Sequence, residues 1–137
     1  MYLVKKTFEN APEFLKSERY QNVSCTVDDA GIEADEHGRK FVPTGTLLDK
    51  AGKAVEVTRT GDAEDSYVYA LSAVPAGILF DTVEVTHGPQ PGALLIDGSV
   101  NTERLQGEYL TEAVAQLVEK MPFIKFFVDG QLQIKEG

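Results

Sequence analysis

Between residues 74 and 101 the sequence places two short apolar runs on either side of a segment of turn-forming residues. Near the end of the first run, Val83 and Val85 alternate with polar neighbours, a pattern typical of a half-buried strand. The second run, residues 93–96, is continuously apolar but too short for a helix, which indicates a buried strand. Residues 87–92 hold prolines and glycines and predict a long turn. This part of the chain therefore indicates strands that build the fold, and it contains no catalytic group in a convincing setting.

Short strand-like runs of the same kind recur along the chain. Predicted strands lie within residues 22–27, 40–48 and 55–60, separated by polar or glycine-containing reversals, and residues 67–74 are rich in aromatic and aliphatic side chains. We expect no central strand to cross Pro75, because proline donates no hydrogen bond to a strand ladder. Asp97 and Gly98 are predicted to end the second apolar run. These patterns predict frequent chain reversals in a mainly β fold.

A helical pattern covers residues 108–120. Its apolar positions can form one stripe facing the core, namely Leu110, Ala113, Val114, Leu117, Val118 and Met121. Thr111 and Glu112 suit the positive end of the helix dipole, and Pro122 predicts where the helix stops. Further on, Asp129-Gly130 joins two extended runs and predicts a type I′ hairpin. The expected fold is mainly β (α+β), with one main helix near the C-terminus and a terminal hairpin.

The composition is that of an ordinary globular protein, with 42% hydrophobic and 26% charged residues. No repeat, low-complexity tract or linker divides the 137 residues, so we expect a single domain over residues 1–137. The net charge of −9 opposes binding to the phosphates of nucleic acid and to anionic membranes. No run approaches the roughly 20 apolar residues of a membrane span, and no signal peptide is predicted. We expect neither nucleic acid nor membrane as a partner.

The sequence offers little for catalysis. Cys25 is the only cysteine, which excludes an internal disulfide and indicates a small buried apolar side chain in a reducing compartment. As a nucleophile it would need His37 or His87, and no local signature surrounds any of the three. The carboxylates of Asp81, Glu84 and Asp97 could pair for acid-base work, but surface charge is the favoured interpretation. We expect no enzyme, no catalytic residues and no cofactor.

An acidic cluster within residues 28–36 invites interpretation as a metal site. Its spacing does not fit an EF-hand loop, because the required glycine and the terminal glutamate are misplaced. A solvated loop is therefore favoured, with His37 as an exposed loop residue, and no metal ligand is predicted. His87 has no nearby nucleophile and lies among turn-forming residues, so a turn is favoured over a general base there as well.

Residues 1–20 mix apolar and charged side chains without a clear period, and four of them are aromatic. Terminal segments of this kind are usually held loosely. A segment that becomes ordered on a partner surface has the same composition. Two interpretations stay open at this point, a packed extra element and an arm that docks onto another protein.

Two runs of the chain, AGILFDTVEVT (residues 76–86) and ALLIDGSVN (residues 93–101), carry a family resemblance. They resemble the central part of the bacteriophage lambda head decoration proteins, in which an AGIL(L/Y)-D-V-x-V-T run precedes an A-x-(V/I)-x-x-G-x-V-N run. FVPTGTLL (41–48) and AGKAV (51–55) extend the resemblance toward the N-terminus. It spans roughly residues 40–130.

This resemblance implies a β-clip-like domain that trimerises at local three-fold sites of an expanded phage or prophage capsid and stabilises the head against DNA pressure. The implied partners are the major capsid protein and two further copies of the chain. The implied location is the outer surface of the virion capsid, after synthesis in the host cytoplasm. The family's N-terminal arm adds a strand to the shell, a role that would fall here to Tyr2, Leu3, Val4, Lys5 and Lys6. Exposed apolar groups of residues 74–101 are expected to meet their symmetry mates.

Other functions remain open, because a fold does not fix a function. The chain has about forty residues before FVPTGT, where the family's arm is usually shorter, which leaves room for another virion role such as the base of a head fibre. A small cytoplasmic β-clip enzyme or ligand-binding domain is the alternative from a different class. Deoxyuridine triphosphatases share a related scaffold, but their glycine-rich phosphate segment and water-activating aspartate are not recognisable in this sequence.

Overall fold

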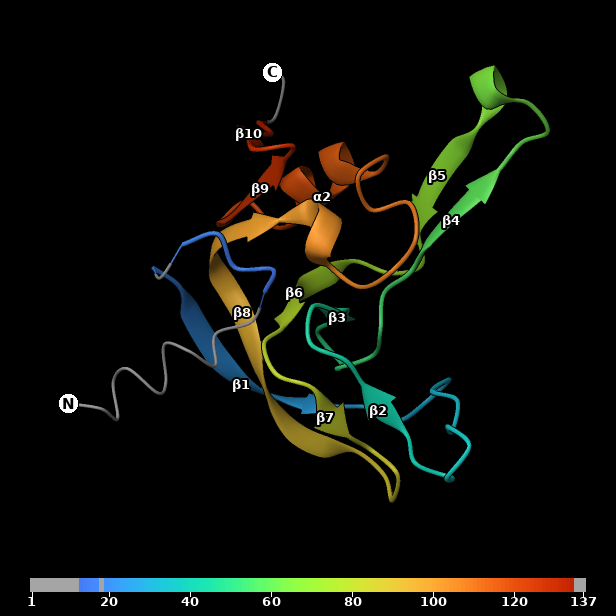
Figure 1. The fold of residues 1–137 in the computed structure, drawn as a ribbon, viewed down its shortest axis with the longest axis vertical. Coiled ribbons are helices and arrows are strands. Elements are labelled where there is room, and N and C mark those ends of the chain that lie inside the picture. Colours follow the sequence, from blue (N-terminus) through green and yellow to red (C-terminus); the bar gives the residue numbers. More distant parts are fainter. Residues whose placement is uncertain (1–12, 18, 135–137) are drawn as a thin grey trace.

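The strands of the protein gather around one long central strand, β8 (Gln90–Asn101). The structure is a computed structural model that describes residues 13–17 and 19–134 (Figure 1). The other elements, in chain order, are β1 (Gln21–Val27), β2 (Phe41–Val42), β3 (Leu47–Asp49), β4 (Val57–Thr60), the 3₁₀ turn η1 (Glu64–Ser66), β5 (Val68–Leu71), β6 (Pro75–Leu79), β7 (Val83–Glu84), the 3₁₀ turn η2 (Thr102–Arg104), the helix α2 (Val114–Lys120), β9 (Ile124–Val128) and β10 (Gln131–Leu132). The described fold is mainly β with one α-helix, as the sequence predicts.

Strand β8 has neighbours on both of its edges. Leu94 and Leu95 pair with β1 and also with β6, and both pairings are antiparallel. Further along, residues 98–101 pair in parallel with β9, while Val100 also forms a bridge with Leu15. A strand has only two edges, so a residue of β8 that pairs with two other strands has a neighbour on each edge. The sheet runs in the order β10, β9, β8, β6 and β3, with β1 as an additional partner of β8.

Adjacent residues of the central strands point into two different hydrophobic clusters. Leu94 and Leu95 lie in different clusters, and so do Ile78 and Leu79. The larger cluster comprises Phe14, Leu47, Val55, Val57, Ile78, Leu95, Val100, Leu105, Leu110, Ala113, Leu117, Met121, Ile124 and Phe126. The smaller comprises Val27, Val42, Leu48, Leu79, Val85 and Leu94. Side chains alternate across a strand, so the sheet is buried on both faces, which explains its continuous apolar runs.

Two further ribbons lie off this sheet, and both are antiparallel pairs. Strand β2 pairs with β7, and β4 pairs with β5. The β4–β5 hairpin projects from the rest of the molecule and carries η1 at its tip (Figure 1). Only the base of this hairpin reaches the larger cluster, through Val57, Tyr69 and Leu71. The hairpin is therefore an arm with a buried root and an exposed end.

The predicted terminal hairpin is confirmed. Strands β9 and β10 are antiparallel, with Val128 opposite Gln131. Asp129 and Gly130 both have positive φ, at 51° and 79°, as a type I′ turn requires. The turn is fastened to η2, because the backbone N–H of Asp129 donates to Oε2 of Glu103 at 2.6 Å. That hydrogen bond lowers the pKa of Glu103 below its usual value.

The helix predicted over residues 108–120 begins later than expected, at Val114. Tyr109 has a φ of 63°, in the left-handed region, and a helix cannot pass through that backbone. Thr111 and Glu112 therefore lie in turns before the helix and do not form its first turn. The apolar stripe is nevertheless in place, with its deepest residue, Leu117, fully buried, and the helix ends at Lys120 before Pro122.

Asp97 and Gly98 do not end the strand that the sequence places at residues 93–96. Strand β8 continues through both residues, and the register shifts opposite them, between Gln21 and Asn22. A bulge of this kind bends a strand without ending it. β8 also begins at Gln90, inside the predicted 87–92 turn, so that turn is shorter than expected.

Pro75 is the first residue of β6, a strand that lies between β8 and β3. No strand crosses Pro75, as the sequence predicts. The first residue is a position where a strand tolerates proline, because no ladder hydrogen bond is lost there. The buried Pro75 ring lies opposite Asp49, where the β3–β6 register shifts.

Part of the N-terminal segment is a packed element. Phe14 is 2% exposed and belongs to the larger cluster. Its carbonyl accepts a hydrogen bond from the N–H of Asn101 at 2.7 Å, and the N–H of Lys16 donates to the carbonyl of Ser99 at 2.9 Å. Of the two interpretations of residues 1–20, the packed element therefore describes the part from Phe14 onward.

Thr102 offers a test of the packing beside β8. The residue is 1% exposed, and its hydroxyl has no hydrogen-bond partner among the residues that the structure describes. A buried hydroxyl without a partner costs free energy, whereas a methyl group of the same shape does not. We expect Thr102→Val to raise the free energy of unfolding by about 1 kcal/mol, measured by urea denaturation. A loss of similar size would show that the hydroxyl has a partner in solution.

Candidate functional site

The predicted capsid-contact residues, Tyr2 to Lys6, lie outside the residues that the structure describes. What is described is the point at which the chain joins the domain. Glu13 is exposed and lies 3.7 Å from Nη1 of Arg104, and the next residue, Phe14, enters the core. Nζ of Lys16 lies over the ring of Phe127, 4.9 Å from its centroid. These contacts anchor residues 13–16, which lie within residues 1–20, the segment for which a docking arm is one interpretation.

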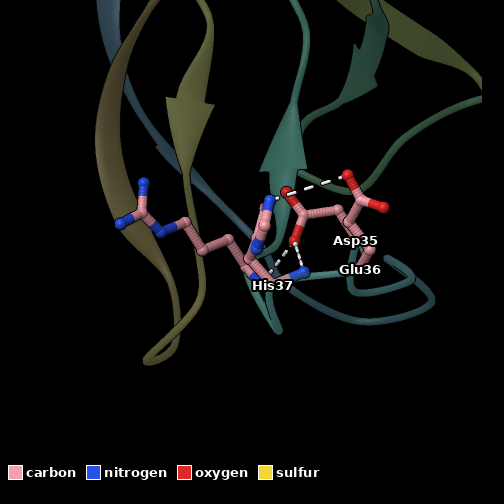
Figure 2. Close-up of polar contacts among 4 residues, drawn as sticks. Asp35, Glu36 and His37 are labelled. Carbon is pink, nitrogen blue, oxygen red and sulfur yellow. Dashed lines mark hydrogen bonds and ion pairs between the residues drawn. The ribbon is translucent and has the colours of Figure 1, made fainter.

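In the acidic loop, a carboxylate accepts hydrogen bonds from the loop's own backbone. Oδ1 of Asp35 accepts the backbone N–H of His37 at 2.8 Å and that of Arg39 at 3.0 Å (Figure 2). Nε2 of His37 lies 3.6 Å from Oε1 of Glu36, and both side chains are largely exposed. Within residues 13–17 and 19–134, no group of three or more His, Cys, Asp and Glu side chains could hold a metal ion. His37 is exposed in this loop, as predicted.

His87 lies at an open depression of about 380 Å³, lined by Glu84, Thr86, His87 and Gln90. The hydroxyl of Thr86 donates to Oε2 of Glu84 at 2.8 Å and accepts the N–H of Lys40 at 3.0 Å. Both the donor and an acceptor site of this hydroxyl are thus engaged. The depression is polar and exposed, and no described contact links His87 to a nucleophile.

Cys25 is half-buried in β1, opposite Gly92 of β8. Burial raises the pKa of its thiol, which disfavours the reactive thiolate. The side chain packs beside the smaller cluster as a small apolar group, though less deeply than predicted.

The three carboxylates considered for acid-base work are all exposed and lie on separate segments. Glu84 is in β7 opposite Phe41, Asp97 is in β8 opposite Gln21, and Asp81 follows β6. Glu84 accepts a hydrogen bond from Thr86, and no described hydrogen bond joins the three carboxylates to one another. Their arrangement gives no support to a paired acid and base.

An aromatic cluster that the sequence did not predict lies at the root of the β4–β5 hairpin. The guanidinium of Arg59 stacks on Tyr67 at 4.1 Å and on Tyr109 at 4.9 Å. Tyr109 also packs against Tyr69, with 5.7 Å between ring centroids, and Nε2 of Gln116 donates to the carbonyl of Tyr69 at 2.8 Å. The positive φ of Tyr109 was the missing signal, since no sequence pattern encodes it. These contacts join the hairpin to α2 and to the turn before it.

The apolar side chains of residues 74–101, expected to meet symmetry mates, are mostly internal. Six of them are buried: Ile78, Leu79, Val85, Leu94, Leu95 and Val100. Val74 is the large exposed exception in that range, at 62%. Large exposed apolar side chains are found elsewhere, at Val68, Phe123, Leu132 and Ile134 among others. Most of the large exposed apolar side chains therefore lie outside residues 74–101.

No protein-family model matches the chain, and no match was found among curated proteins or solved structures. No helix in the described part of the chain is both long and apolar enough to cross a membrane. The features that stand out from the geometry are surfaces, namely the anchored N-terminal junction, the projecting hairpin and the exposed apolar residues near the C-terminus. Such features are suited to binding another protein.

Proposed function

We propose that this protein is a structural component of a phage or prophage virion that decorates the capsid. The observation that carries the proposal is the position of the two runs with the family resemblance. AGILFDTVEVT supplies most of β6 and all of β7, and ALLIDGSVN supplies the larger part of β8. The two runs pair directly, with Ile78 opposite Leu95 and Leu79 opposite Leu94. The resemblance thus lies in residues that build the centre of the sheet.

In this proposal the chain forms a homotrimer over local three-fold positions of the expanded shell and binds the major capsid protein. The domain is β-clip-like, as in the lambda head decoration family. Its net charge of −9 suits an exterior protein that does not bind the packaged DNA. Residues 2–6 act as the docking arm, and the buried Phe14 fixes where that arm leaves the domain. Decoration resists the pressure of packaged DNA by clamping neighbouring capsomers.

The test is binding of the full chain to isolated expanded shells of the parent phage, followed by sedimentation and quantification. We expect saturation at three chains per local three-fold site, with much weaker binding to unexpanded shells. A variant lacking residues 2–12 retains Phe14 and should fold, but it should lose binding to the shells. If the full chain does not co-sediment with expanded shells, the proposed function is wrong. If the shortened chain binds equally well, the arm is not the docking element.

A further inference from the structure

One exposed apolar surface lies on the β9–β10 ribbon. Ile124 and Phe126 of β9 point into the core, so the alternate residues Lys125 and Phe127 lie on the outer side of the ribbon. Leu132 pairs with Phe127 and therefore shares this side. We call this side, together with the exposed residues Phe123 before β9 and Ile134 after β10, the terminal face; its residues are Phe123, Lys125, Phe127, Leu132 and Ile134.

The terminal face is more apolar than a solvated ribbon requires. Phe123 and Ile134 are each 73% exposed, and Leu132 is 45% exposed. Lys125 is part of this face and Lys16 lies over the ring of Phe127, whereas the carboxylates of Asp129 and Glu103 lie at the turn of the ribbon. In a chain with a net charge of −9, an apolar surface flanked by lysines favours an acidic, partly apolar partner.

The β4–β5 hairpin has an uncharged side and an acidic tip, which complement the terminal face. In its antiparallel register Thr58 lies opposite Ala70 and Thr60 opposite Val68, and all four side chains are exposed. We call this uncharged side the hairpin face; its most exposed apolar residue is Val68, at 61%. Asp62, in the loop between the strands, and Asp65, in η1, are both exposed and make the hairpin tip acidic.

We propose that the hairpin of one copy docks on the terminal face of the next copy. The hairpin and the β9–β10 ribbon lie on different sides of α2 (Figure 1), so the two surfaces meet between copies and not within one. The contact joins two different surfaces, and such a head-to-tail contact closes into a ring when the rotation permits. This inference rests on the homotrimer of the proposed function and assigns the surfaces that form it.

The conformation of the hairpin is also restrained before this contact forms. Arg59, stacked between Tyr67 and Tyr109, fixes its root, so little conformational entropy is lost when its end is bound. The acidic loop is the less suitable occupant of the terminal face. Asp35 bonds its own backbone and Glu36 lies beside His37. No large side chain of residues 28–40 is among the strongly exposed apolar residues, whereas Val68 lies close to the hairpin tip.

The experiment is a charge exchange in the full chain, with mass in solution measured by light scattering after size exclusion. We expect the wild type at three times the 15.0 kDa chain mass. Lys125→Glu should raise the dissociation constant at least about tenfold, because it places a carboxylate against the acidic tip. The double variant Asp62→Lys/Asp65→Lys should do the same. Combining all three substitutions should restore much of the assembly.

Lys53→Glu is the matched control, since this exposed lysine lies in the turn after β3 and should leave the mass unchanged. All these positions are exposed, and circular dichroism should show folded protein throughout. A wild type that stays at the single-chain mass at every concentration overturns the inference. So does loss of assembly by Lys125→Glu that is restored by Glu33→Lys/Glu36→Lys and not by the hairpin variants.

Binding to expanded shells distinguishes a failure of this inference from a failure of the proposed function. If the charge exchange behaves as expected but the trimer ignores expanded shells, the hairpin contact stands and the decoration function fails. If Lys125→Glu keeps the wild-type mass but loses the shells, the terminal face belongs to the shell contact and the hairpin inference is wrong.

Discussion

Phe14→Ala should lower the free energy of unfolding by about 3–5 kcal/mol, the range for removing a large aromatic side chain from a core. Phe14 is 2% exposed, and its ring meets that of Phe80 edge to face, with 6.5 Å between centroids. The backbone of Gly45 packs against the ring, since a Cβ atom added there would lie 3.5 Å from Cδ2 of Phe14. Equilibrium denaturation in guanidinium chloride measures the loss directly.

Phe41→Ala is the matched control, because Phe41 is an aromatic residue of a short strand but is 39% exposed. We expect a loss of about 1 kcal/mol or less there, since much of the ring already contacts water. Equal losses at the two positions would mean that residues 13–17 do not belong to the folded core in solution. The comparison also decides where an N-terminal truncation can be made, since removing Phe14 would destabilise the domain that the truncation is meant to isolate.

The strands could be predicted from the sequence because their signals are local. Alternation along Val23, Cys25 and Val27 predicted β1, and Asp129-Gly130 predicted the terminal hairpin together with its turn type. The continuous apolar run at residues 93–96 predicted a buried strand, and the sheet is indeed covered by a hydrophobic cluster on each face. In each case the pattern within a few residues contains the needed information.

The errors arose where a distant contact decides the local backbone. Tyr109 takes a left-handed conformation beside Arg59 and Tyr69, which are some forty or more residues away in the chain, and this conformation delays the helix. Gly98 continues β8 because it pairs with Ile124 of β9, and the bulge just before it, at Ile96, bends the strand without ending it. In the sequence Gly98 resembles a strand breaker and Tyr109 an ordinary helix residue, and tertiary packing overrides both signals.

The candidate surfaces were harder to predict than the strands. The sequence placed trimer contacts in residues 74–101 because that region is the most apolar and carries the family resemblance. Apolar content alone does not distinguish a strand buried on both faces from one that presents a face to another molecule. Strand pairing makes this distinction: β6 and β8 are covered within the chain, whereas Leu132 lies in β10, the outer strand of the sheet, and the exposed Ile134 follows it.

Gly52→Ala should be among the most damaging substitutions of one small residue in this protein. Gly52 has a φ of 84°, and a Cβ atom there would lie 1.7 Å from the carbonyl oxygen of Thr26 in β1. The glycine carbonyl also accepts the N–H of Asp28 at 3.0 Å, so the turn cannot move away without breaking that hydrogen bond. We expect a loss of about 3 kcal/mol or more in the free energy of unfolding, from backbone strain and the lost contact with β1.

The variant Gly38→Ala separates the cost of backbone strain from the cost of the close approach to β1. Gly38 has a similar φ of 76°, but a Cβ atom added there meets nothing within 4 Å. Its expected loss is about 1–2 kcal/mol, the conformational cost of a left-handed alanine alone. The difference between the two variants, measured by denaturation under identical conditions, is the free-energy cost of the clash with Thr26. If the two losses are equal, the turn after β3 does not approach Thr26 this closely in solution.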